Sequence, residues 1–191
     1  MNDETIGNQQ EMPTLDELGW FAGILEGEGS ISMNVRRKKW NGWNGIGVDL
    51  HLQVVNSDSA IIKKAKDILL KLGIEPHLYE RENVPIYKKD GNCYHNPTKT
   101  LISLSISKMS KIHSILTLIE PFMAGEKKTR ASLIREFIDR RLSRKGDQTV
   151  DGPSWYDAYD WGLVNKFYEI NGGKLLPEVR QFLNDHMRTA Q

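Results

Sequence analysis

Residues 20–35 read WFAGILEGEGSISMNV, and their pattern changes in the middle. Up to this stretch, apolar residues recur at the spacing of one helix face: Leu15, Leu18, Phe21, Ala22 and Leu25. After Gly29, apolar Ile31, Met33 and Val35 alternate with polar residues, which predicts a half-buried strand. Three glycines and two glutamates lie between these patterns, within residues 21–29. Glycine is a poor helix former, so these glycines and acids need a specific reason.

The pattern on either side predicts the remaining elements. Thr14 or Asp16 can cap the first helix, and Gly73 can end the second. Strands are expected near residues 30–36, 48–55, 77–84 and 100–107, and helices near 57–73, 108–121 and 126–142, with a polar loop at 88–99. This order predicts an α+β fold, αββαββα. Its curved four-stranded antiparallel sheet has helices on one face, and a helical extension follows at the C-terminus.

The same reading divides the chain into three parts. Residues 1–13 are expected to be a disordered tail, 14–145 the core domain, and 146–191 a linker with the helical extension. The aromatic residues of the extension can either pack on the core or extend contacts to a partner; packing is favoured because acids intervene. They are Trp155, Tyr156, Tyr159 and Trp161.

Composition sets further bounds on the 191-residue chain, whose net charge is +1. The net charge is −7 in residues 1–35, +11 in 36–145 and −3 in 146–191. Either a polyanionic partner or an ordinary solvated Lys/Arg surface accounts for this asymmetry. The single cysteine, Cys93, excludes an internal disulfide and a cysteine-rich zinc site. No signal peptide or membrane span is recognised. The expected location is therefore intracellular, in a bacterial, phage or archaeal cytoplasm or in an organelle.

The outward face of the predicted sheet is polar and, on balance, basic. Such a face can be simply solvated, but the flanking loops RRKKW and YKK are basic too, which favours a surface that reads DNA in the major groove. The candidate DNA-binding residues on it are Ser30, Ser32, Asn34, Arg36, Lys38, Asp49, His51, Gln53, Tyr79 and Arg81, with His77 beside them.

The segment FAGILEGEG, residues 21–29, resembles the nine-residue signature of the LAGLIDADG homing endonucleases. The strand that follows, the order of elements, and the segment VVNSDSAIIKKAKDILLKLGI are similar to that family as well. The resemblance covers roughly residues 14–145. Phe and Glu stand in this sequence where the eponymous motif has Leu and Asp.

The resemblance implies a reason for the glycines and acids. Ala22, Gly23 and Gly27 would let two copies of the helix approach closely at a dimer interface. Two copies of Glu28 would then meet, and like charges so close require cations between them. The resemblance thus implies two or three Mg²⁺ ions shared at the dimer interface, with the Glu28 carboxylate and the Gly27 carbonyl as ligands.

The resemblance also implies two more catalytic positions besides Glu28. Asn56 matches a polar residue that orders water near the metals, although a helix N-cap is an equal alternative. Lys127 matches a basic residue near the scissile phosphate. Lys128 is the alternative, because MAGEKKTRASL aligns only with a one-residue gap. Glu26 matches an acid that is usually structural.

Only one copy of the signature is present, and single-motif members of this family act as homodimers. The implied function is a site-specific, metal-dependent double-strand DNA endonuclease. Its target would be long and pseudo-palindromic, and cleavage would leave 3′ overhangs. Two alternatives remain: an RNA maturase that binds intron RNA and assists splicing, or a DNA-binding regulator without cleavage. The retained Glu28 argues against the second.

Overall fold

The structure is a computed structural model that describes residues 11–40, 43–81, 86–87, 93–95, 100–144, 156–172, 177 and 180–181. Its helices are α1 (Leu15–Glu28), α2 (Ser59–Lys71), α3 (Met109–Ile119), a 3₁₀ turn (Glu120–Phe122), α4 (Gly125–Ser143) and α5 (Ala158–Ile170). Its strands are β1 (Gly29–Trp40), β2 (Trp43–Asn56), β3 (His77–Arg81), β4 (Ile86–Tyr87), β5 (Cys93–His95) and β6 (Leu101–Ile106). Side chains of residues 37–40, 43–45, 81, 86–87 and 93–95 lie outside the described part.

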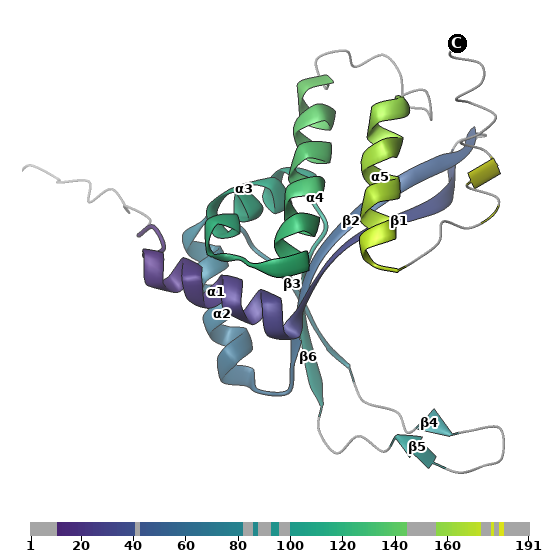
Figure 1. The fold of residues 1–191 in the computed structure, drawn as a ribbon. Helices are drawn as coiled ribbons and strands as arrows, with labels where there is room; N and C mark the ends of the chain where they lie inside the picture. Colours follow the sequence, from purple (N-terminus) through teal and green to yellow (C-terminus); the bar gives the residue numbers. More distant parts are fainter. Residues whose placement is uncertain are drawn as a thin grey trace, which may run out of the picture.

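The main sheet is antiparallel and has the strand order β1-β2-β6-β3. The predicted α+β fold, with a four-stranded antiparallel sheet behind one layer of helices, is confirmed (Figure 1). One prediction of detail was wrong: the segment expected to be a polar loop contains β5, which pairs with β4 in a separate small sheet. The third strand is present from His77 to Arg81, and the rest of its expected range, residues 82–84, lies outside the described residues.

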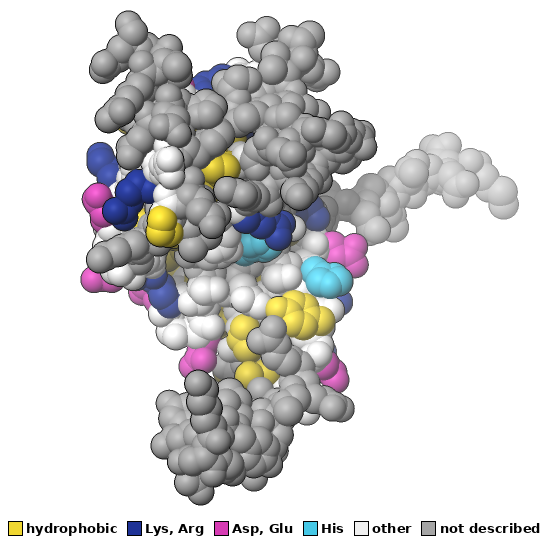
Figure 2. Space-filling model, turned by 90° about the vertical axis from the view of Figure 1, so that its right-hand side faces the viewer, with side chains coloured by type: hydrophobic (Ala, Val, Ile, Leu, Met, Phe, Trp, Pro, Cys, Tyr) yellow, Lys and Arg dark blue, Asp and Glu magenta, His cyan; other side chains and the backbone are white. Residues whose placement is uncertain are grey.

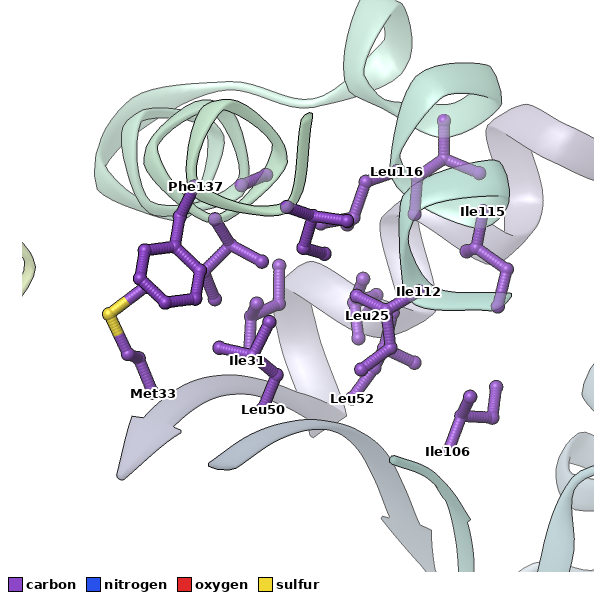
Figure 3. Close-up of a cluster of buried hydrophobic side chains, with 14 of the residues drawn as sticks. Leu25, Ile31, Met33, Leu50, Leu52, Ile106, Ile112, Ile115, Leu116 and Phe137 are labelled. Carbon is purple, nitrogen blue, oxygen red and sulfur yellow. The ribbon is translucent and has the colours of Figure 1, made fainter. Parts of the chain in front are cut away.

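The hydrophobic core lies between the sheet and the helices. Alternate residues of β1 and β2 point into it, among them Met33, Leu50 and Leu52, which are at most 2% exposed. Phe137 of α4 lies against Met33, and Leu25 of α1 lies above Leu52 (Figure 3). The periodic apolar residues named from the sequence therefore belong to one continuous core, with the exception of Leu15, which is 72% exposed.

Helix boundaries follow local chemistry. The side chain of Thr14 accepts a hydrogen bond from the N–H of Glu17, and the Glu17 carboxylate accepts one from the N–H of Thr14. Of the two predicted caps, Thr14 is therefore the one that begins α1, through a capping box. Pro121 lies in the 3₁₀ turn directly after α3, and Gly73 follows Leu72, the C-cap of α2, with a φ of +68°. Both breaks occur where the sequence predicts them.

The C-terminal extension belongs to the same core. Trp161, Val164 and Phe167 of α5 are at most 4% exposed and cluster with the residues of α4 and the sheet. The prediction that Tyr156 and Trp161 pack on the core is confirmed, whereas Tyr159 is 54% exposed. Trp155, and most of the extension after residue 172, lie outside the described residues.

Candidate nucleic-acid interface and active site

The C-terminus of α1 runs directly into the exposed sheet face. The N–H of Gly29 donates to the Leu25 carbonyl, and β1 begins at the same residue. A Cβ on Gly29 would lie 2.5 Å from Leu25 Cδ1 and 2.7 Å from the Leu25 carbonyl oxygen. Only glycine therefore fits this junction. The junction leaves Glu28 exposed at the helix terminus, beside the first residue pair of the sheet.

Lys127 holds this terminus from the other side. Its ammonium group donates to the carbonyls of Leu25 at 3.0 Å, of Glu26, and of Gly29 at 2.8 Å. Lys127 thus supplies the positive charge that a helix C-terminus favours. Partial burial lowers the pKa of Lys127 and nearby Arg130 adds to the shift, whereas the negative charges of Glu26 and Glu28 oppose it.

Glu26 points to a different group. Its Oε1 accepts a hydrogen bond from the N–H of Ala124 at 2.5 Å, at the residue that precedes α4. The Glu26 side chain therefore ties α1 to the start of α4, in agreement with its structural assignment. Of the two acids in the signature, only Glu28 remains directed to solvent.

Asn56 lies at the same end of the sheet. Gly29 pairs with Val54, so Asn56 is two residues beyond the partner of the first β1 residue. Its Oδ1 accepts a hydrogen bond from the N–H of Asp58 at 2.8 Å, and Asp58 is the N-cap of α2. The structure brings Glu28, Lys127 and Asn56 to one end of β1 and β2, and it gives the N-cap role to Asp58.

The predicted DNA-binding residues line one face of the sheet, away from the helices. The register pairs Ser30 with Gln53, Ser32 with His51, and Asn34 with Asp49, on consecutive rows of the same face. Figure 2 views this side: between grey regions much of it is backbone and uncharged non-hydrophobic side chains, with histidine, Lys or Arg, Asp or Glu and some hydrophobic side chains among them. Lys38 and Arg81 belong to β1 and β3 by backbone, but their side chains lie outside the described part.

Polar contacts cross this face from strand to strand. Gln53 Nε2 donates to the Tyr79 hydroxyl at 2.7 Å and to Ser103 Oγ at 2.5 Å, which joins β2, β3 and β6. Arg36 forms an ion pair with Asp49 across β1 and β2. Ser103 and Ser105 were not singled out from the sequence. The alternation in LISLSI places both serines on the face of the strand away from Leu104, and this pattern could have identified them from the sequence.

The expected small-residue interface needs one correction. Ala22 is 0% exposed and packs inside its own chain, so it cannot contact a partner. Gly23 and Gly27 are exposed, and a Cβ added at either would have no other atom within 4 Å. Packing within the chain therefore does not require glycine at these two positions.

The donor set at this end suits a hard cation only in part. The Glu28 carboxylate and the Gly27 carbonyl are oxygen ligands of the kind that Mg²⁺ prefers. Among the described residues, no group of three or more His, Cys, Asp or Glu side chains could hold a metal ion. Separately, no helix in the described ranges is both long and apolar enough to cross a membrane.

Solved structures share this fold at low sequence identity. The homing endonuclease I-CvuI, in complex with the I-CreI target, matches with a TM-score of 0.60 at 16% identity, over 91% of this chain and 98% of that one. I-GzeII in complex with a DNA target matches with a TM-score of 0.54 at 12% identity, over 86% of this chain and 47% of that one. I-SmaMI bound to cleaved DNA matches with a TM-score of 0.53 at 16% identity, over 92% and 50%. This chain thus spans nearly all of I-CvuI and about half of the other two.

Sequence comparison gives the family. No curated protein matches the chain. The profile of a family described as a LAGLIDADG-like domain matches residues 16–120, which is more than half of the 191 residues. The matched range contains the signature, the whole four-stranded sheet and Glu28. By this match the chain belongs to the LAGLIDADG-like domain family, and its fold is the one found in the homing endonuclease structures named above.

Proposed function

We propose that this chain is a site-specific, divalent-metal-dependent double-strand DNA endonuclease that acts as a homodimer. The observation that carries the proposal is Glu28, an exposed carboxylate held at the junction where α1 enters the polar sheet face. A carboxylate in that place sits next to any duplex that the face binds.

The sheet face supports DNA as the partner. Its side chains offer both donors and acceptors in consecutive rows, which suits hydrogen bonding to base edges. β1 and β2 form a long two-stranded ribbon, and such ribbons fit the major groove. The related structures I-GzeII and I-SmaMI are complexes with DNA.

The exposed face of α1 supports a homodimer. Leu15, Gly19, Gly23 and Gly27 follow one another four residues apart and so lie on neighbouring positions of one helix face. Leu15 is 72% exposed, and Gly23 and Gly27 leave open space. A second α1 can approach this face closely. The chain also spans about half of I-GzeII and of I-SmaMI, as one half of a pair would.

Metal binding follows from that pairing. Two Glu28 carboxylates with the Gly27 carbonyls would provide hard oxygen ligands for Mg²⁺, and the I-CvuI complex was studied with Mg. A bound Mg²⁺ supplies Lewis-acid stabilisation of the phosphate and a more acidic water. We propose that cleavage occurs on a long pseudo-palindromic target and leaves 3′ overhangs.

The other residues at this end have supporting roles in the proposal. Lys127 places a fixed positive charge near Glu28, where it would stabilise negative charge developing on the phosphate. Its hydrogen bonds to three carbonyls also fix the position of the α1 terminus that presents Glu28. Asn56 uses Oδ1 for Asp58, so its amide nitrogen is the group that would orient a water molecule.

The test compares the wild type with Glu28→Gln on a randomised duplex library in Mg²⁺. Glu26→Gln is the matched control, because it changes the neighbouring acid and keeps an acceptor for the N–H of Ala124. We expect the wild type and the control to cut a pseudo-palindromic site. We expect Glu28→Gln to bind it as a dimer with cleavage reduced at least about 100-fold.

Two outcomes contradict the proposal. Equal cleavage by Glu28→Gln would remove the role of that carboxylate. No cleavage by the wild type in either Mg²⁺ or Mn²⁺ would reject the nuclease. Salt-sensitive binding of the wild type to a structured intron RNA would then identify a maturase, and specific duplex binding alone would identify a regulator.

A further inference from the structure

Among the described residues, the outer part of the β1–β2 ribbon has no neighbouring strand on either side. β1 is at the edge of the sheet, and β2 pairs with β6 only from Leu52 to Asn56. From the pair Ser32 and His51 outward, β1 and β2 pair only with each other in this part of the chain. A two-stranded ribbon is marginally stable by itself. This part nevertheless carries the polar residues Asn34, Arg36 and Asp49.

Tyrosines from the C-terminal extension bind both edges of this ribbon. The N–H of Val35 donates to the hydroxyl of Tyr168 at 3.1 Å, and the N–H of Val48 donates to the hydroxyl of Tyr156 at 3.3 Å. Val35 and Val48 are paired with each other in the register. In an antiparallel pair that does not exchange hydrogen bonds, the two N–H groups point outward in opposite directions. The two hydroxyls therefore cap opposite edges of the ribbon at the same level.

Helix α5, which contains Tyr168 and begins two residues after Tyr156, is itself fixed in place. Asp160, which is 0% exposed, accepts hydrogen bonds from Arg140 at 2.9 Å and from Arg144 at 2.7 Å. The ring of Tyr156 stacks on Phe137 of α4, with the centroids 5.9 Å apart. Figure 1 shows α5 beside α4 and along the ribbon. The ribbon is thus connected through α5 to the helical layer.

We propose that Tyr156 and Tyr168 are positioning residues for target recognition. By capping the two edges, they hold the outer ribbon in the geometry in which Asn34, Arg36 and Asp49 read the outer base pairs of each half-site. Inner base pairs, read from the row of Ser30 and Gln53, depend instead on the four-stranded part of the sheet. This proposal rests on the proposed DNA-binding function.

The test uses Tyr156→Phe and Tyr168→Phe, singly and together, because phenylalanine keeps the ring and removes only the hydroxyl. Tyr159→Phe is the matched control: Tyr159 is on the same helix, and its hydroxyl donates to Glu136 of α4, not to the ribbon. The first readout is amide hydrogen exchange in the free protein. We expect exchange about 2- to 10-fold faster at Val35 in Tyr168→Phe and at Val48 in Tyr156→Phe, with no change in the control.

The second readout is the loss of binding affinity that each single base-pair change in the target causes. We expect the double variant to discriminate between base pairs about 2- to 10-fold less well at the outer positions of the target. At the inner positions we expect the same discrimination as in the wild type. The cleavage rate at saturating protein should not change. Unchanged amide exchange would overturn the bracing role, and faster exchange with an unaltered specificity profile would overturn the positioning role. If the wild type binds no duplex, the DNA-binding function and the positioning role fail together. The exchange data would still show whether the two hydroxyls stabilise the outer ribbon.

Discussion

The two ends of the β1–β2 ribbon are stabilised by different means. At the inner end, β2 lies between β1 and β6, and Lys127 of α4 holds the junction of α1 and β1. At the outer end, the described part of the chain has only the two strands β1 and β2. There the hydroxyls of Tyr168 and Tyr156 accept hydrogen bonds from strand N–H groups that would otherwise bond to a neighbouring strand. The proposed DNA cleavage is at the inner end of the ribbon, and the proposed recognition of the outer base pairs is at its outer end. If both proposals hold, the core fold supports catalysis and the added helix supports recognition.

The largest effect is expected at the outer end, from Asp160→Asn. The wild-type carboxylate is buried and binds two guanidinium groups, Arg140 and Arg144, so the change leaves their charges less compensated. We expect a loss of about 3 kcal/mol in the free energy of unfolding, measured by urea denaturation. Hydrogen exchange should also increase first in the outer ribbon.

Asp157→Asn is the control for that change, because Asp157 binds the same two arginines while its side chain is 49% exposed. An exposed pair contributes at most about 1 kcal/mol. Equal losses for the two variants would show that burial of Asp160 is not what fixes α5.

The next effect is expected at the inner end, from Lys127→Met. The methionine keeps most of the aliphatic chain but leaves the carbonyls of Leu25, Glu26 and Gly29 without their ammonium donor. We expect about 1–3 kcal/mol lower stability and roughly 100-fold slower cleavage at the selected target. Denaturation and single-turnover kinetics measure the two parts separately.

Lys128→Met is the matched control, since Lys128 was the alternative assignment from the sequence. We expect Lys128→Met to retain most activity and stability. A larger loss of cleavage with Lys128→Met would move the active-site assignment to that residue.

The sequence predicted the inner end better than the outer end, for physical reasons. The helix-to-strand change at Gly29 is a local pattern, and the alternation of β1 and β2 fixes which side chains share a face. The helical periodicity already placed Ala22 on the apolar face, and Ala22 is buried there; its assignment to the dimer interface was wrong because the motif does not tell which small residues face the core. The Tyr168 and Val35 contact joins residues 133 positions apart, and nothing in local periodicity indicates such a pairing. The short strand β5 was missed because its polar, cysteine-containing segment has a weak strand pattern.

The smallest effect concerns the start of α1, at the far end of the helix from Glu28. Hydrogen bonds from the Lys71 ammonium group, at 2.7 Å, and from the N–H of Thr14 lower the pKa of Glu17 below its ordinary value of 4.5. Because this pKa is lower in the folded state than in the unfolded chain, the stabilisation is fully present above pH 4.5 and is lost as the pH falls through the folded-state value. Glu17→Gln should therefore lower the Tm at pH 7 by about 1–2 °C, and the difference should vanish in acid.

Asp16→Asn separates the ion pair from the general effect of a negative charge in the first turn of α1. Asp16 is exposed and lies in the same turn, where any carboxylate interacts favourably with the helix N-terminus. If the pair with Lys71 matters, thermal denaturation at pH 7 should show a larger decrease in Tm for Glu17→Gln than for Asp16→Asn. Equal decreases would assign the effect to the helix terminus alone. Because α1 is held by the half-buried Glu17–Lys71 pair at its start and by Lys127 at its end, acid should loosen the start of the helix and leave the junction that presents Glu28 in place.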